Sequence, residues 1–166
     1  AEIIVTTTFT TRRLRLRDNK IEEKFEYLNK KAGEIAQKAK KQYPHVLIAG
    51  GLPPQYLTYE EDTRADEEIK QNFYDQANLL DPYIDFFYFD VLSSVKEFKL
   101  AIEAIATFNK PYLIGAHISE GIKLPSGEAI SDIITKINHK NLLGLILSCV
   151  SPENYLENLD ELKILG

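Results

Sequence analysis

Two kinds of hydrophobic spacing alternate along the chain. Short runs of consecutive apolar residues, typical of buried strands, occur at residues 3–10, 45–51, 84–92, 111–118 and 142–149. After each run, apolar residues recur every three or four positions. This spacing predicts amphipathic helices at residues 21–39, 69–80, 94–106, 130–137 and 155–162. The sequence therefore predicts five strand–helix units in strict alternation.

Local signals mark the ends of some elements and the segments between them. Pro44 stops the first predicted helix, and Ser94 with Glu97 forms a capping box at the start of the third. The basic run at residues 11–17 is interpreted as a solvated loop from the first strand to the first helix, in preference to a phosphate grip. Residues 52–62 are predicted to form a long loop, and long loops in compact domains are often functional.

The alternation of strands and helices favours one parallel sheet with right-handed crossovers. The later strands begin roughly 30 residues apart, which is the rhythm of a (β/α)₈ barrel. The predicted fold is thus α/β, a single domain over residues 1–166 that forms an incomplete TIM barrel with about five of the eight strands. The alternative is a complete, open, doubly wound domain. The chain lacks the glycine-rich phosphate fingerprint that such a domain normally carries.

Composition narrows the choice of partners. The chain is 44% hydrophobic and 27% charged, which is enough to bury a core. A net charge of −5 argues against nucleic-acid and anionic-membrane partners, because neither would be attracted electrostatically. One cysteine excludes an internal disulfide and fits a cytoplasmic setting, and no apolar run approaches the roughly 20 residues that span a bilayer.

Residues with chemical potential follow the predicted strands. The strand ends carry Thr6–Thr8, Gly50-Gly51, Asp90, His117 and Cys149, and the ends of parallel strands share one rim. Thiolate, imidazole and carboxylate are zinc ligands, and they are also the parts of a nucleophilic Cys–His–Asp site. Structural roles remain open for each of them: a small buried hydrophobe for the cysteine, a satisfied histidine, and a capping carboxylate.

Several short motifs occur in an order and spacing that resemble the homocysteine S-methyltransferase family. These zinc enzymes methylate homocysteine from betaine, S-methylmethionine or related donors. The motifs include a strand ending in Thr-x-Thr-Phe, a glycine turn, a strand ending in an acidic residue, and a cysteine segment before a helix. They lie at residues 3–9, 28–32, 49–54, 85–90, 124–128 and 148–153.

The resemblance implies roles for four residues. Cys149 would be a zinc ligand, Asp90 would contact the amino group of homocysteine, and Thr8 and Gly51 would lie on the pocket rim. Zinc would lower the pKa of the homocysteine thiol, and the resulting thiolate would attack a methyl group on a cationic nitrogen or sulfur, giving methionine. The implied partners are small molecules.

The chain departs from the family pattern in residues that the family uses in its site. It has no counterpart of the adjacent cysteine pair that completes the zinc site, it has Asp90 where the family has glutamate, and residues 146–148 replace a Gly-x-Asn segment. A catalytic zinc usually has three protein ligands, so the chain is expected to be inactive alone. Two other functions remain open. One is a non-catalytic half-barrel module whose open sheet edges favour homo-oligomers, and the other is an enzyme that uses Cys149, His117 and Asp90 as nucleophile, base and orienter.

Overall fold

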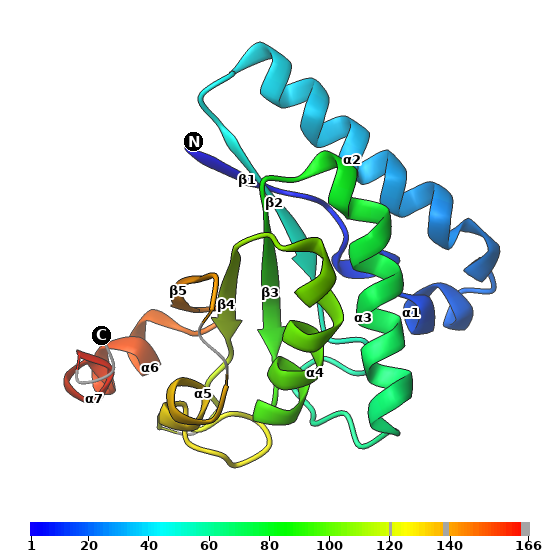
Figure 1. The fold of residues 1–166 in the computed structure, drawn as a ribbon. Coiled ribbons are helices and arrows are strands. Elements are labelled where there is room, and N and C mark those ends of the chain that lie inside the picture. The colour runs from blue at the N-terminus through cyan, green and yellow to red at the C-terminus, as the bar shows by residue number, and fades with distance from the viewer. Residues whose placement is uncertain (120, 138–139, 164–166) are drawn as a thin grey trace.

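Five strands form one sheet in the computed structural model, which describes residues 1–119, 121–137 and 140–163. The strands pair in chain order, and every neighbouring pair is parallel. They are β1 (Ile3–Val5), β2 (Leu47–Leu52), β3 (Phe86–Leu92), β4 (Tyr112–Ala116) and β5 (Leu142–Leu147) (Figure 1). The prediction of an α/β fold with parallel strand–helix units is confirmed.

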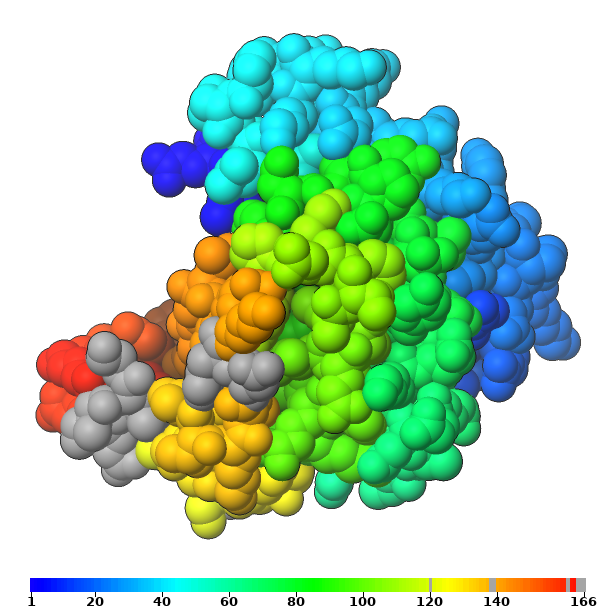
Figure 2. Space-filling view, viewed as in Figure 1, coloured from blue at the N-terminus to red at the C-terminus, as the bar shows by residue number. Residues whose placement is uncertain are grey.

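Seven α-helices connect and follow the strands in the described residues. Helices α2, α3 and α4 lie in a layer over one face of the sheet, with α5 beside α4 and with α6 and α7 beyond β5 (Figures 1 and 2). None of the described helices is long and apolar enough to cross a membrane. The helices are α1 (Arg13–Asp18), α2 (Phe25–Gln42), α3 (Asp66–Leu80), α4 (Val95–Ile105), α5 (Ser131–Lys136), α6 (Pro152–Glu157) and α7 (Leu159–Lys163).

The main core lies between the sheet and this helix layer. Ile48, Phe87 and Ile114 point from the strands into it, and Phe73 and Phe98 meet them from α3 and α4. All five side chains are fully buried. We call this side of the sheet the helix face.

The opposite side of the sheet, which we call the open face, holds a much smaller cluster. Its buried members are Ala49, Phe86 and Tyr88, with Leu113 packed against them, and all four come from strands. Strand pairing places further apolar side chains on this face toward both edges, where they are exposed. The open face thus comprises Ile3, Val5, Leu47, Ala49, Phe86, Tyr88, Leu113 and Ile146.

Both edge strands are shorter and more exposed than the sequence predicts. β1 ends at Val5 instead of residue 10, and Leu143 of β5 is 58% exposed although its run is entirely apolar. The prediction that these two strands are buried is wrong. An apolar run has the same pattern in a central strand and in an edge strand, but an edge strand has only one neighbour in the sheet.

Most of the basic run at residues 11–17 lies in a helix, α1 (Arg13–Asp18), and not in a solvated loop. Arg12 at its start is buried, and its guanidinium donates to the carbonyl of Phe9 at 2.9 Å and to that of Tyr56 at 3.1 Å. Burial lowers the pKa of Arg12 from its ordinary value. This arginine therefore holds the loop after β2 against the chain that follows β1.

The predicted helix ends agree better with the structure. Helix α2 stops at Gln42, and the hydroxyl of Ser94 accepts a hydrogen bond from the backbone N–H of Glu97 at 3.1 Å. These features confirm the stop before Pro44 and the capping box of α4. The single helix predicted at residues 155–162 is instead two short helices, α6 and α7.

Candidate functional site

Side chains from β3, from the segments after β4 and β5, and from the loop after β2 meet at the carboxyl ends of the strands. We call this group the rim site. Three of its residues, Asp90, His117 and Cys149, were predicted from the sequence to lie here. The other three come from the loop after β2, from β3 and from the segment after β5. Its members are Tyr59, Tyr88, Asp90, His117, Ser148 and Cys149.

Cys149 follows the end of β5 and has an exposed thiol. Its thiol lies beside the hydroxyl of Tyr59, and this interaction is the largest cause that raises the pKa of Tyr59 above its ordinary value. The ring of Tyr59 packs on that of His117, with centroids 4.5 Å apart. The Nδ1 atom of His117 lies 3.2 Å from the carbonyl oxygen of Ser148, so Nδ1 carries the proton that it donates. His117 thus contacts the backbone immediately before the thiol.

Asp90 is half-buried near the end of β3. Burial raises the pKa of its carboxyl group, and a hydrogen bond from Tyr88 opposes that rise. The strand register shifts between Phe89 and Leu92, and Val91 has a φ of 65°. A β-branched residue in this conformation is a genuine outlier that costs on the order of 1–3 kcal/mol. The chain therefore turns sharply just after Asp90.

Two residues of the rim site have a strained backbone conformation. Tyr59 has a φ of 67° and Cys149 a φ of 56°, both in the left-handed region that non-glycine residues rarely adopt. Together with Val91, these residues lie in or next to the rim site. Such conformations persist where surrounding contacts hold them, and they are common at functional sites.

Tyr88 and Ser148 are the two most buried residues of the rim site. Their hydroxyl oxygens are 2.6 Å apart, and both residues are less than 10% exposed. Burial raises the pKa of Tyr88 far above its usual range, so the phenol stays protonated. Tyr88 was not predicted from the sequence as a site residue. The available signal was its place two residues before Asp90, on the same side of the strand.

Thr8 and Gly51 belong to a buried polar cluster at the ends of β1 and β2. The Thr8 hydroxyl donates to the carbonyl of Gly51 at 2.7 Å, and the N–H of Gly51 donates to the Thr6 hydroxyl at 2.9 Å. The carbonyl of Thr8 accepts a bond from Gln76 of α3. Thr8 is fully buried. The predicted contact of Thr8 and Gly51 with a substrate stays a prediction.

A bound zinc ion would need more ligands than this site provides. No group of three or more His, Cys, Asp and Glu side chains among the described residues could hold a metal ion. Asp90, His117 and Cys149 therefore do not make a zinc site together, and the residues of the rim site do not by themselves fit a catalytic zinc, which usually takes three protein ligands. Cys149, whose thiol is exposed, supplies one metal ligand at most.

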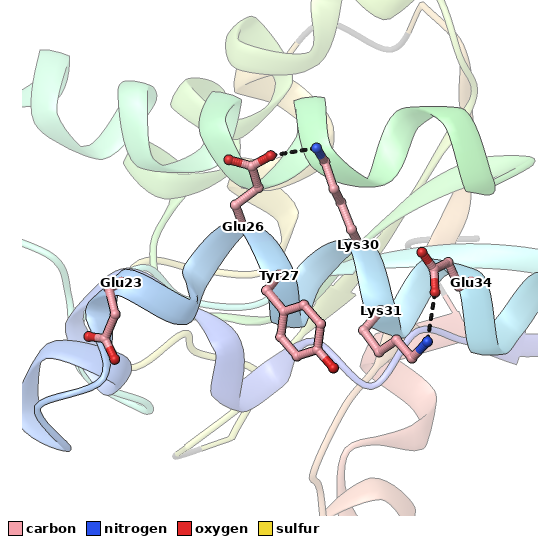
Figure 3. A pocket seen from close by; sticks show the side chains of 6 residues that line it. All are labelled: Glu23, Glu26, Tyr27, Lys30, Lys31 and Glu34. Carbon is pink, nitrogen blue, oxygen red and sulfur yellow. Dashed lines mark hydrogen bonds and ion pairs between the residues drawn. The ribbon is translucent and has the colours of Figure 1, made fainter.

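A shallow hollow elsewhere on the surface offers no comparable chemistry. All its lining residues come from α2 and the turn before it (Figure 3). Two ion pairs cross it, Lys30 with Glu26 at 2.5 Å and Lys31 with Glu34 at 2.9 Å. Exposed ion pairs of this spacing are typical of a solvated helix face. The lining residues are Glu23, Glu26, Tyr27, Lys30, Lys31 and Glu34.

A profile of the homocysteine S-methyltransferase family matches residues 1–166, the whole chain. The chain belongs to the homocysteine S-methyltransferase family. The resemblance predicted from the sequence motifs is thereby confirmed. A search of curated proteins gave no significant match.

Several solved structures share the fold of this chain. The metallated form of the homocysteine methyltransferase MmuM from Escherichia coli has a TM-score of 0.88 at 18% identity, and its oxidized form has 0.87 at 20%. Both alignments cover 100% of this chain but only 64% and 63% of MmuM. The carboxyl transferase domain of Rhizobium etli pyruvate carboxylase is more distant, with a TM-score of 0.52 at 16% identity, covering 86% of this chain and 25% of that one.

Proposed function

We propose that this chain provides part of a site that transfers a methyl group from a cationic donor to the sulfur of homocysteine, giving methionine. The donor would be betaine, S-methylmethionine or a similar compound. The observation that carries the proposal is the joining of Asp90 and Cys149 at one rim, through Tyr88 and Ser148, in a chain of this family. In the reaction, the homocysteine thiol would first lose its proton to solvent, and the thiolate sulfur would then form a bond to the methyl carbon. The bond from that carbon to the donor nitrogen or sulfur breaks, and its electron pair leaves with the donor.

Asp90 is proposed to bind the amino group of homocysteine. Its carboxylate is half-buried, so its charge is poorly solvated, and the raised pKa reports this cost. An ammonium group placed beside the carboxylate would replace the missing solvation with a charge-assisted hydrogen bond. The bond from Tyr88 meanwhile fixes the orientation of the carboxylate.

Cys149 is proposed to be a metal ligand, with zinc as the metal that the family implies. When bound, zinc lowers the pKa of a coordinated thiol and so favours thiolate at neutral pH. The chain's own contribution is an exposed thiol held at the end of β5. Because the described residues lack a group of three ligands, the remaining ligands would have to come from outside them.

Thr8 and Gly51 are proposed to lie on the rim of the same pocket. The hydroxyl of Thr8 is already bonded to the Gly51 carbonyl, so their part would be to fix the ends of β1 and β2.

Exposed apolar residues on both edge strands are compatible with a homo-oligomer, which sedimentation would test. A cytoplasmic location is proposed from the single free cysteine.

The alternative in which Cys149 is a nucleophile has less support. His117 would have to take the proton of the thiol through Nε2, because its Nδ1 donates to the carbonyl of Ser148, and no hydrogen bond joins this ring to the thiol among the described residues. The thiol lies beside the hydroxyl of Tyr59 instead. No observation favours this reaction over methyl transfer.

Calorimetric titration of the chain with homocysteine, with and without zinc, tests the proposal. Wild type is expected to bind homocysteine, and Asp90→Asn is expected to weaken binding at least about tenfold because it removes the charge that meets the ammonium group. Cys149→Ser is expected to abolish any gain that zinc gives. Asp160→Asn, which changes a carboxylate that is 97% exposed, is the matched control and should bind as wild type does. Unchanged binding by Asp90→Asn would overturn the assignment.

A further inference from the structure

We propose that Tyr88 is a positioning residue that connects the carboxylate of Asp90 to the turn at Cys149, with Ser148 as the intermediate. The roles given to Asp90 and Cys149 rest on the proposed function, whereas the connection itself is a property of the fold. One end of the connection is the group proposed to bind substrate, and the other is the group proposed to bind metal. Tyr88 would set the position of one relative to the other.

The proton count fixes the direction of the hydrogen bonds. The Tyr88 hydroxyl forms a hydrogen bond with the Ser148 hydroxyl at 2.6 Å, and it lies close enough to the Asp90 carboxylate for each group to shift the pKa of the other. A carboxylate only accepts hydrogen bonds, so the single phenol proton goes to Asp90. The Ser148 hydroxyl then donates to the Tyr88 oxygen. The Ser148 hydroxyl and the Asp90 carboxylate are thus linked through the Tyr88 hydroxyl.

Ser148 affects the position of the Cys149 thiol because three hydrogen bonds fix Ser148 itself. Its N–H donates to the carbonyl of Ala116 at 2.8 Å, its carbonyl accepts from His117 at 3.2 Å, and its hydroxyl meets Tyr88. The next residue is Cys149, in a left-handed conformation that costs energy for any side chain but glycine. The contacts of Ser148 are therefore what keep the Cys149 turn in this conformation.

Gly115 on the neighbouring strand makes room for the contact. A Cβ atom at this position would lie 2.6 Å from the Ser148 hydroxyl oxygen, 2.6 Å from the Tyr88 ring and 2.7 Å from the carbonyl oxygen of Phe89. No real Cβ makes contacts so close, and the Phe89 carbonyl is backbone that cannot swing away. The missing side chain of Gly115 is therefore required for Tyr88 and Ser148 to meet.

Burial makes the connection energetically important. Tyr88 is 9% exposed and Ser148 8%, so a hydroxyl that lost its partner could not turn to solvent. An unsatisfied buried donor or acceptor costs more than an exposed one, and chained hydrogen bonds reinforce one another. Removing either hydroxyl should thus release both the Asp90 carboxylate and the Cys149 turn.

The rate of alkylation of Cys149 by iodoacetamide measures this connection directly, because the chain has one cysteine. The variants are Tyr88→Phe, Ser148→Ala and the double variant, each in the full chain at one pH. We expect each single variant to change the rate constant by a factor on the order of three, in the same direction. The double variant should match the singles, because all three lose the same contact.

Tyr112→Phe is the control, since Tyr112 is a buried tyrosine on the helix face of the next strand. Its rate constant should stay near that of wild type. If the two single effects multiply in the double variant, or if neither single variant changes the rate constant, the proposal is overturned. Ser148→Ala removes one oxygen atom only, so it keeps the test valid if Tyr88→Phe fails to fold.

Homocysteine titration of the same variants separates this proposal from the proposed function. We expect Tyr88→Phe to weaken homocysteine binding, by less than Asp90→Asn does, because the carboxylate remains but loses its orientation. If wild type binds no homocysteine while the alkylation effects fail to multiply, the proposed function is overturned and the positioning role stands. If wild type binds homocysteine and the alkylation effects multiply, the positioning role is overturned and the proposed function stands.

Discussion

The two faces of the sheet differ in what covers them and in which side chains they carry. On the helix face, Ile48, Phe87 and Ile114 are fully buried against α3 and α4. On the open face, the buried cluster is limited to Ala49, Phe86 and Tyr88, and apolar side chains toward the edges are exposed. The same strands contribute to both faces, because alternate residues point in opposite directions.

The two faces therefore contribute differently to the stability of the fold and to the chemistry of the site. The helix face holds most of the buried apolar surface, which is the main source of folding free energy. The open face ends in hydroxyl, carboxylate and thiol groups that meet at the strand ends. Substitutions on the helix face should therefore lower stability, and substitutions around the rim site should change the thiol and ligand binding.

The largest expected effect comes from replacing isoleucine by alanine on the two faces of adjacent strands. Ile114→Ala, at a fully buried position, should lower the free energy of unfolding by about 2–5 kcal/mol. Ile146→Ala, at a position that is 41% exposed, should cost less than about 1 kcal/mol. Urea unfolding of both variants measures the difference. Equal losses would show that the two faces contribute alike.

The next effect concerns Glu97, a carboxylate buried on the helix side at the start of α4. Burial raises its pKa to about 7 from the ordinary 4.5, and its Oε1 has no hydrogen-bond partner in the described part of the chain. A raised folded-state pKa stabilises the protein below the unfolded-state pKa, and that stability is lost as pH rises through about 7. The free energy of unfolding should thus fall by about 3 kcal/mol between pH 4.5 and pH 8.

Glu97→Gln should remove most of that pH dependence, because the amide cannot ionise. Glu103→Gln in the same helix is the control, since Glu103 is an exposed carboxylate paired with Lys70, and it should leave the slope unchanged. Chemical unfolding at a series of pH values gives the comparison. A wild-type slope retained in Glu97→Gln would mean that another group causes it.

A smaller effect is expected from alanine at two glycines in neighbouring strands. Gly115→Ala would force a Cβ against Tyr88 and Ser148 and should cost about 1–3 kcal/mol, while also changing the alkylation rate of Cys149. At Gly144 the nearest atom to an added Cβ is 3.7 Å away, an ordinary contact, so Gly144→Ala should be nearly neutral. Thermal unfolding and alkylation of both variants check this. Similar results for the two glycines would remove the argument for a close approach at Gly115.

The sequence predicted the strand–helix alternation, because apolar runs and helical spacing are local patterns. It also placed Asp90, His117 and Cys149 together at the carboxyl ends of the strands, which follows from parallel pairing. It did not predict the exposure of β1 and β5, since an apolar run does not show whether a strand has one neighbour or two.

The partners within the rim site could not be predicted either. Tyr88 resembles the other aromatic residues of its strand in the sequence, and only the register with β4 and β5 brings its hydroxyl to Ser148. Tyr59 comes from a long loop whose course no periodic pattern describes. Contacts between segments far apart in the chain depend on tertiary packing, which local propensity does not contain.

The most direct test of this account is a titration of the isotope-labelled chain with homocysteine, followed by backbone amide chemical shifts. We predict that the shifts change at Asp90, Ser148 and Cys149, where the rim site gathers its polar groups. Amides of the helix face, such as those of Ile48 and Phe87, should stay unchanged. Shifts confined to the α2 hollow, or no shift at any concentration, would contradict the claim that the strand ends of the open face carry the function.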